Sequence, residues 1–99
     1  MDVKLSGFDW DDGNREKCQK HVVSIDETEN LFLGQPRIAP DLKHSGTEDR
    51  FIAVGRTTKR RPLFVAFTFR ISAMGVLVRP ISARYMQGKE IEGYESQSS

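Results

Sequence analysis

Three segments rich in β-branched and aromatic residues follow one another closely in the second half of this 99-residue chain, and they restrict its fold more than any other feature. Residues 51–56, 63–70 and 75–82 each have the composition of a β-strand. The connections between them are short enough for antiparallel hairpins. Pro80 lies inside the third segment, and because proline cannot donate to a strand ladder it indicates an edge position or a bulge. The sequence therefore predicts a three-stranded antiparallel meander.

The first half of the chain carries the signals of two helices. Asp11 and its acidic neighbours offer N-cap oxygens to a first helix with a thin apolar stripe. Ser24 and Glu27 form a capping box, in which each side chain accepts a hydrogen bond from the other residue's backbone amide. In chain order the expected elements are a strand in residues 5–10, a helix over 12–21, a helix over 24–33, a loop over 34–49 with a short strand at 38–39, the meander, and a helix over 85–95.

This order predicts an α+β fold. We expect an antiparallel sheet made of the N-terminal strand and the meander, with two N-terminal helices on one face and a short C-terminal helix. A chain of 99 residues suits one domain. We expect that domain to cover residues 1–95 and the polar tail, residues 96–99, to be disordered.

Composition excludes several classes of protein. No apolar run approaches the roughly 18 residues of a membrane span, and the N-terminus lacks the layout of a secretory signal. Cys18 is the only cysteine, which precludes an internal disulfide and is typical of a reducing cytoplasm. One cysteine and two histidines are too few ligands for a structural zinc site. The basic residues follow no helix-turn-helix pattern, which disfavours a DNA-binding subunit.

Charge is segregated along the chain. Residues 1–49 hold eleven acids and six bases, a sum of −5, and residues 50–99 hold nine bases and three acids, a sum of +6, so the total is +1. Between residues 50 and 89 there is no Asp or Glu. Such segregation predicts a polyanionic partner for the basic half.

Strand parity groups several arginines on one face of the predicted sheet. Because side chains alternate across a strand, residues 63, 65, 67 and 69 form the expected core face. The opposite face is expected to carry Arg50, Arg56, Arg70 and Arg84, with the turn residues Lys59, Arg60 and Arg61 at its rim. Arg79 has the other parity unless Pro80 produces a bulge.

Guanidinium groups on a rigid sheet favour a surface for a phosphodiester backbone, because each matches two phosphate oxygens and stays charged. The alternative is that these arginines pair with acids of the first helix. The lack of acids between residues 50 and 89 favours the first interpretation, since a structural arginine usually has a carboxylate nearby.

Three motifs, in the right order, resemble those of BrnT-family toxins. Phe8-Asp9-Trp10-Asp11, followed by Lys20-His21 and Ser24, resembles the family's opening F-x-W-D … K-H-G-V-S. Residues 48–56 resemble its E-x-R-F-x-A-x-G-R strand, and residues 79–84 resemble its R-x-I-S-A-R strand end, with Lys89-Glu90 and Tyr94 in the trailing helix. The resemblance covers residues 8–95 and is more specific than any single motif.

The resemblance implies a RelE-like fold and the toxin of a type II toxin–antitoxin pair. The implied activity is RNA cleavage without a metal or other cofactor, which inhibits translation. The implied partner is a BrnA-like ribbon-helix-helix antitoxin, expected in a heterotetramer, and operator DNA would be contacted only through that antitoxin.

The motif positions and strand parity nominate site residues. Arg84 and Arg50 are the candidates for catalytic stabilisation of the phosphate. Glu48, His44 and Tyr85 are candidate proton carriers, although a surface ion pair, a solvated loop histidine and a packed helix tyrosine remain the respective alternatives. The expected RNA-binding residues are Arg56, Lys59, Arg60, Arg61, Arg70 and Arg79.

Two positions depart from the family pattern. Val22 stands where relatives usually have glycine, and a positive φ there would strain valine by roughly 1–3 kcal/mol. Gln87-Gly88 replaces a pair that in many relatives includes histidine. If that histidine moves protons, this chain is a weak or inactive nuclease, and the alternative function is binding to RNA or antitoxin without cleavage.

Overall fold

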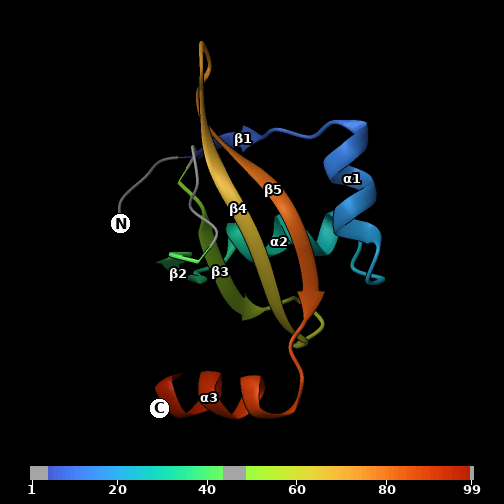
Figure 1. Ribbon diagram of the computed structural model, residues 1–99, viewed down its shortest axis with the longest axis vertical. Helices are drawn as coiled ribbons and strands as arrows, with labels where there is room; N and C mark the ends of the chain where they lie inside the picture. Colours follow the sequence, from blue (N-terminus) through green and yellow to red (C-terminus); the bar gives the residue numbers. More distant parts are fainter. Residues whose placement is uncertain (1–4, 44–48, 99) are drawn as a thin grey trace.

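The computed structural model describes residues 5–43 and 49–98 (Figure 1). Its elements are β1 (Leu5–Phe8), α1 (Asp12–Gln19), α2 (Ile25–Leu33), β2 (Arg37–Pro40), β3 (Phe51–Arg56), β4 (Pro62–Ser72), β5 (Gly75–Tyr85) and α3 (Gly88–Ser98). This order is the predicted one, including the short strand at residues 38–39, which here extends over four residues as β2. Within the described ranges, no helix combines the length and apolarity needed to cross a membrane.

The strands form one five-stranded sheet in the order β1-β5-β4-β3-β2. The pairs β2–β3, β3–β4 and β4–β5 are antiparallel, which confirms the meander. β1 instead runs parallel to β5, with Leu5 opposite Val76. The prediction of a wholly antiparallel sheet is therefore wrong for β1. A parallel neighbour needs a long connection, and the helices and strands between β1 and β5 supply it.

Both N-terminal helices begin at the expected caps. The Asn14 backbone amide donates to the Asp11 side chain at 2.9 Å, and the Asp11 amide donates to the Asn14 side chain at 2.7 Å. The predicted capping box of α2 is present, with the Glu27 amide donating to Ser24 Oγ at 3.0 Å. α1 ends at Gln19, two residues earlier than expected, and the chain then turns at Val22 with a φ of +71°.

The core lies between the sheet and the N-terminal helices. α2 crosses one face and α1 lies beside β5 (Figure 1). The core face of β4 is the predicted one: Leu63, Val65 and Phe67 are fully buried, and the Phe67 ring lies 4.9 Å from that of Phe32 in α2. Cys18 of α1 is buried in the same cluster, and this burial raises the pKa of its thiol to about 11.

A bulge in β5 changes which residues share a face. β4 pairs Ala66 with Ser82 but Phe67 with Pro80, so Ile81 is an extra residue. Pro80 is buried, and its carbonyl accepts a hydrogen bond of 2.9 Å from the Asn14 side chain. The bulge that Pro80 indicated is therefore confirmed, and it turns Arg79 to the face opposite the core.

The C-terminal helix differs from the prediction at both ends. Tyr85 pairs with Leu63 in the sheet, and the Met86 amide donates to the Pro62 carbonyl at 3.0 Å. α3 therefore begins only at Gly88, where φ is +40°, rather than at Tyr85. It continues through residues 96–98, which we predicted to be disordered. After Gly93 the segment contains neither glycine nor proline, the residues that most strongly end a helix.

Candidate nucleic-acid interface

The face of the sheet opposite α2, called the open face here, carries side chains in rows defined by cross-strand pairing. One row contains Arg37, Val54, Phe64 and Arg84, and the next contains Ala39, Ile52, Ala66 and Ser82. Beyond the second row, Arg79 pairs with Thr68, and continuing the register brings Arg50 beside them. Successive rows are about 7 Å apart, because residues two apart on a strand share a face. A row of small and apolar side chains thus lies between two rows that contain arginines.

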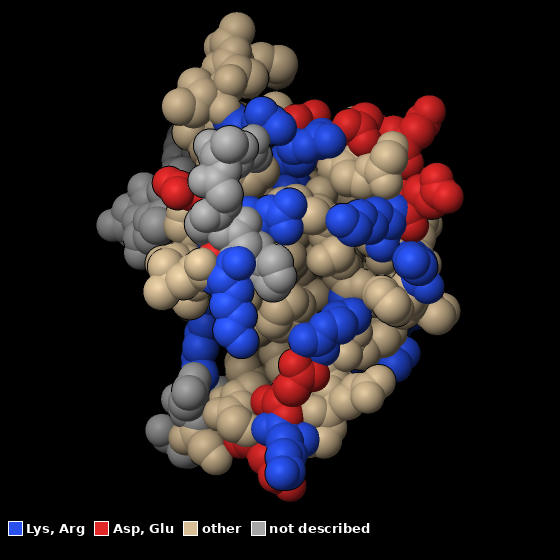
Figure 2. Space-filling model, in the orientation of Figure 1, with Lys and Arg blue, Asp and Glu red and all other residues tan. Residues whose placement is uncertain are grey.

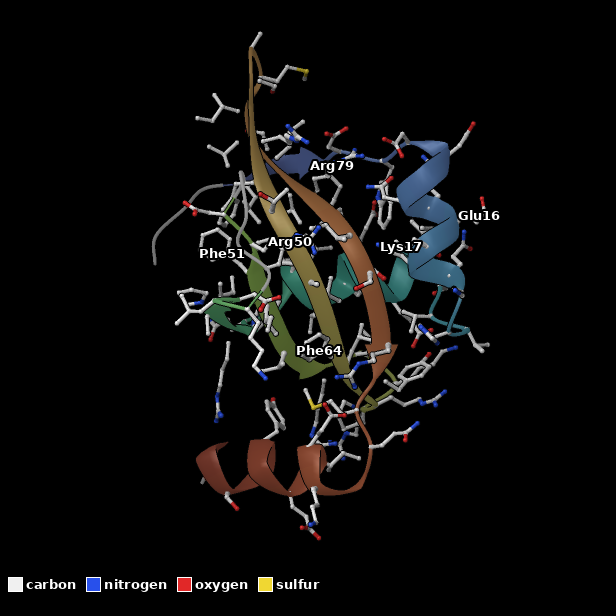
Figure 3. All side chains as sticks on the ribbon, viewed as in Figure 1. Glu16, Lys17, Arg50, Phe51, Phe64 and Arg79 are labelled. Carbon is white, nitrogen blue, oxygen red and sulfur yellow. The ribbon has the colours of Figure 1, made fainter. Side chains whose placement is uncertain are left out.

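A groove of about 650 Å³ lies in the middle of the open face. Its basic residues are Lys17 of α1, Lys43 after β2, Arg50 before β3 and Arg84 near the end of β5. Figure 3 shows Lys17 on the side of α1 that borders the sheet, and Arg50 and Phe64 on the face toward the viewer. Lys and Arg side chains gather on this face, with acids toward α1 and α3 (Figure 2). Segments far apart in the sequence therefore contribute to one cationic groove.

Arg84 is held from two sides. Its guanidinium donates to both carboxylate oxygens of Glu90 in α3, at 2.7 Å each, and its central carbon lies 4.3 Å from the ring centre of Phe64. The hydrogen bonds raise the pKa of Arg84 and lower the pKa of Glu90. The expectation that Arg84 has no carboxylate nearby is therefore wrong. The acid-free stretch ends just before Glu90, and the chain folds back after β5.

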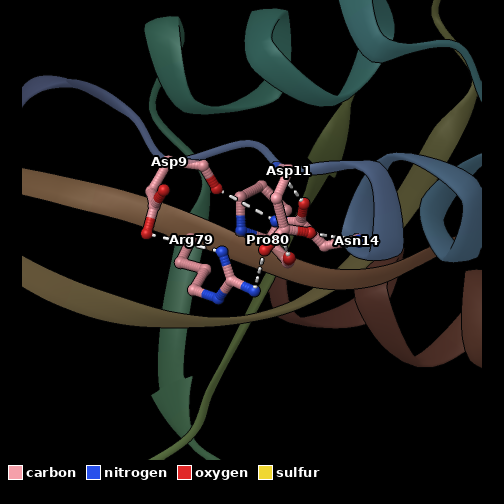
Figure 4. Close-up of polar contacts among 5 residues, drawn as sticks. All are labelled: Asp9, Asp11, Asn14, Arg79 and Pro80. Atoms are coloured by element: carbon pink, nitrogen blue, oxygen red, sulfur yellow. Dashed lines mark hydrogen bonds and ion pairs between the residues drawn. The ribbon is translucent and has the colours of Figure 1, made fainter.

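Arg79 is bound to the acids that precede α1. Its Nη2 donates to Asp11 at 2.6 Å, and its Nη1 lies 3.4 Å from an oxygen of Asp9 (Figure 4). The hydrogen bond from the Asn14 amide and then that from Arg79 lower the pKa of Asp11. Arg79 therefore joins β5 to the start of α1. At this position the alternative interpretation, an arginine paired with N-terminal acids, is the correct one.

The other predicted RNA-binding residues divide between the two faces. Arg56 and Arg70 are exposed and lie toward opposite ends of the open face. The turn residue Arg61 lies 3.6 Å from the ring centre of Tyr85, whose hydroxyl donates to Glu27 of α2 at 2.6–2.7 Å. Placing the whole turn at the rim of the open face is therefore wrong for Arg61, because its partner Tyr85 belongs to the core face.

Lys59 also interacts with Glu27 through its charge. Arg60 has a φ of +63°, and its carbonyl accepts a hydrogen bond of 3.0 Å from Arg56. The turn thus directs Lys59 and Arg61 toward Glu27 and Tyr85 and leaves Arg60 beside Arg56.

A model of the family "ribonuclease toxin, BrnT, of type II toxin-antitoxin system" matches residues 10–90. The match spans most of the chain and includes every element that borders the groove. The chain belongs to the BrnT family. Its RelE-like α+β fold and its membership of a toxin–antitoxin system, both implied by the motifs, are confirmed. No curated protein matches this BrnT chain.

Several groove residues of this BrnT chain were not identified from its sequence. Lys17 lies in the polar first helix, where nothing distinguishes it from its neighbours, and Asp41 and Lys43 lie in a segment read as loop. Phe64 carried a usable signal, because its parity in β4 is opposite to that of the core residues. An aromatic side chain beside a basic groove offers a surface on which a nucleic-acid base can stack.

The predicted proton carriers His44 and Glu48 lie outside the described residues. Among the groove residues that the structure describes, Asp41 is the one carboxylate. The described part of the chain holds no group of three His, Cys, Asp or Glu side chains placed to bind a metal ion.

Proposed function

We propose that this BrnT-family toxin is an endoribonuclease that binds RNA across the groove of the open face and cleaves it without a metal ion. The observation that carries the proposal is the grouping of Lys17, Lys43, Arg50 and Arg84 around one groove. Cations so arranged favour a phosphodiester backbone, because they neutralise several phosphates at once. The row of small and apolar side chains between them leaves room for sugar and base.

Cleavage without a metal requires three things of the site. The ribose 2′-hydroxyl must be aligned with the phosphorus, the charge that grows on the phosphate oxygens must be stabilised, and protons must leave the 2′-oxygen and reach the departing 5′-oxygen. We expect Arg50 and Arg84 to bind the phosphate oxygens. His44, Glu48 and Asp41 are the candidates for the proton transfers.

Incubation of the purified protein with single-stranded RNA in EDTA tests this proposal. The wild type is expected to cleave, and Arg50→Ala and Arg84→Ala are each expected to lower the rate constant by about 100- to 1,000-fold. Arg15→Ala is the matched control, because Arg15 is an exposed base of α1 outside the groove. RNA that stays intact with the wild type both with and without EDTA refutes the enzymatic proposal, and cleavage that EDTA abolishes refutes metal independence.

The second candidate function is binding of RNA or antitoxin without cleavage. The pairing of Arg84 with Glu90 favours it, because a carboxylate already neutralises one of the two arginines proposed to stabilise the charge that grows during cleavage. Gln87, in place of the histidine of many relatives, also favours it. A salt-sensitive complex from which intact RNA is recovered would distinguish this function from cleavage.

We also propose a BrnA-like ribbon-helix-helix antitoxin as the partner, in a heterotetramer that contacts operator DNA only through the antitoxin. Residues 1–95 would form the toxin domain, and inhibition of translation would occur in the cytoplasm. The family's type II classification supports an antitoxin partner. Induction of this chain alone in bacteria is expected to stop growth, and Arg84→Ala or the antitoxin is expected to relieve the arrest. Normal growth on induction of folded wild type would contradict the proposal.

A further inference from the structure

α3 lies along one row of the open face and contacts both of its ends. The row is Arg37, Val54, Phe64 and Arg84. At one end Glu90 binds Arg84 through both carboxylate oxygens, and at the other the Tyr94 ring centre lies 5.1 Å from the guanidinium carbon of Arg37. Glu90 and Tyr94 are four residues apart and so lie on the same side of the helix.

Apolar packing contributes little to the position of α3. None of its described side chains is buried, and only Ile91 and Tyr94 are half-buried. A space of about 250 Å³, bordered by Val54, Phe64 and Tyr94 among others, lies between the helix and the sheet. Figure 1 shows α3 at the end of the molecule, reached from β5 through a short link. The identified contacts at the two ends of the row are polar or cation–π contacts.

We propose that α3 is an internal competitor for RNA, in which the Glu90 carboxylate occupies the site on Arg84 that a phosphate of the RNA would take. The inference rests on the proposed function of the open face. A carboxylate and a phosphate both bind the same two N–H groups of a guanidinium fork. Glu90 must therefore leave Arg84 when RNA binds there.

The competition is expected to be weak enough for RNA to overcome. The Arg84 and Glu90 side chains are 40% and 43% exposed, and ion pairs with this exposure bind weakly. An RNA that places several of its phosphates on the groove replaces one carboxylate with many negative charges. Met86 is held by its hydrogen bond to Pro62, so the link at Gln87 and Gly88 is where the helix would pivot.

Binding of a 2′-O-methyl oligoribonucleotide, which lacks the attacking hydroxyl, tests the competition without cleavage. Glu90→Gln is expected to tighten binding about two- to fivefold, because only an exposed pair is lost. Glu92→Gln removes the same charge from the same helix and is expected to have a smaller effect. In an Arg84→Ala background, Glu90→Gln and Glu92→Gln are expected to change the affinity for the oligoribonucleotide by the same factor. The proposal would be overturned if Glu90→Gln and Glu92→Gln changed the RNA affinity equally in the wild-type background. It would also be overturned if their effects on affinity still differed in the Arg84→Ala background.

Hydrogen exchange of the α3 amides in the free protein is a second measurement, and it needs no RNA. Glu90→Gln is expected to speed exchange across residues 88–98 relative to Glu92→Gln. Identical exchange in the two variants overturns the role of Glu90, even in a protein that cleaves RNA. Faster exchange in Glu90→Gln, with no RNA bound by any variant, overturns the proposed function of the open face and with it the competition.

Discussion

At the scale of the residue, Val22 combines an unfavourable backbone conformation with a largely exposed side chain. Its φ is +71° and its side chain is 85% exposed. A β-branched residue in the left-handed region is strained by about 1–3 kcal/mol. A glycine adopts this conformation without strain.

Val22→Gly is therefore expected to raise the free energy of unfolding by about 1 kcal/mol, since the relief of strain exceeds the roughly 0.4–1 kcal/mol lost through greater freedom of the unfolded chain. Urea denaturation measures the change. His21→Gly, at an exposed neighbour without a positive φ, is the control and is expected to lower stability. A less stable Val22→Gly protein would contradict the assignment of strain.

The pair of Asp11 and Arg79 predicts a pH dependence of stability. The pKa of Asp11 in the folded protein lies below its usual value of 3.8. Its contribution is therefore present above the unfolded pKa and is lost as the pH falls through the lowered folded value. Asp11→Asn keeps an N-cap acceptor but loses the charge. The variant is expected to have a lower Tm than the wild type at pH 7, and this difference is expected to shrink below about pH 4.

Thermal unfolding from pH 7 to pH 2 measures the effect. Asp12→Asn is the matched control, because Asp12 is also an exposed acid at the start of α1, whereas the described ion pairs of Arg79 are with Asp9 and Asp11. A Tm difference for Asp11→Asn that stays constant over the whole range would contradict the role of the charge.

At the scale of the element, the close approach of α2 to β3 depends on Gly55. A Cβ at this position would lie 2.8 Å from Leu31 Cδ1 and 3.5 Å from Pro36 Cα. Gly93 in α3 is the opposite case, because a Cβ there would meet no atom within 4 Å. Alanine substitutions at the two glycines therefore distinguish the cost of a steric clash at Gly55 from the effect of helix propensity alone at Gly93.

Gly55→Ala is expected to lower the free energy of unfolding by about 1–3 kcal/mol through overpacking. Gly93→Ala, in the interior of a helix, is expected to stabilise α3 by up to about 1 kcal/mol. Urea denaturation compares the global stabilities, and circular dichroism follows helix content. A Gly55→Ala protein as stable as the wild type would show that α2 can move away from β3 at no cost in the free energy of unfolding.

At the scale of the whole molecule, the separation of acids and bases along the chain is only partly preserved in space. Folding brings Asp9 and Asp11 to Arg79 and brings Glu90 to Arg84. The groove nevertheless keeps basic residues from α1, β5 and the segments beside β2 and β3, with Asp41 as its described acid.

The affinity for single-stranded RNA is therefore expected to fall with salt. Four phosphate contacts predict a slope of log K against log salt concentration of about −3, at roughly 0.7 per phosphate. Arg50→Ala is expected to reduce this slope by about 0.7, and Arg15→Ala is expected to leave it unchanged. Fluorescence anisotropy titrations of a 2′-O-methyl oligoribonucleotide at several salt concentrations measure it. A slope near zero would exclude the groove as a phosphate-binding surface.

Features with a local cause were predictable from the sequence. The capping box of Ser24 and Glu27, the core parity of Leu63, Val65 and Phe67, and the bulge indicated by Pro80 each depend on residues close together in the chain. The family was also recognisable, because its motifs are contiguous. Arg50 and Arg84 were placed on the right face for the same reason: alternation along a strand is a local rule.

Only the tertiary structure decided which charges meet. The parallel pairing of β1 brings Asp9 and Asp11 to Arg79, the bulge turns Arg79 toward them, and the fold-back of α3 brings Glu90 to Arg84. Lys17 joins the groove because α1 lies beside β5. The sequence thus determines the strands, the helices and their faces through local geometry. The neighbours of each arginine depend on the register of distant strands and on chain reversals, and local geometry does not set these.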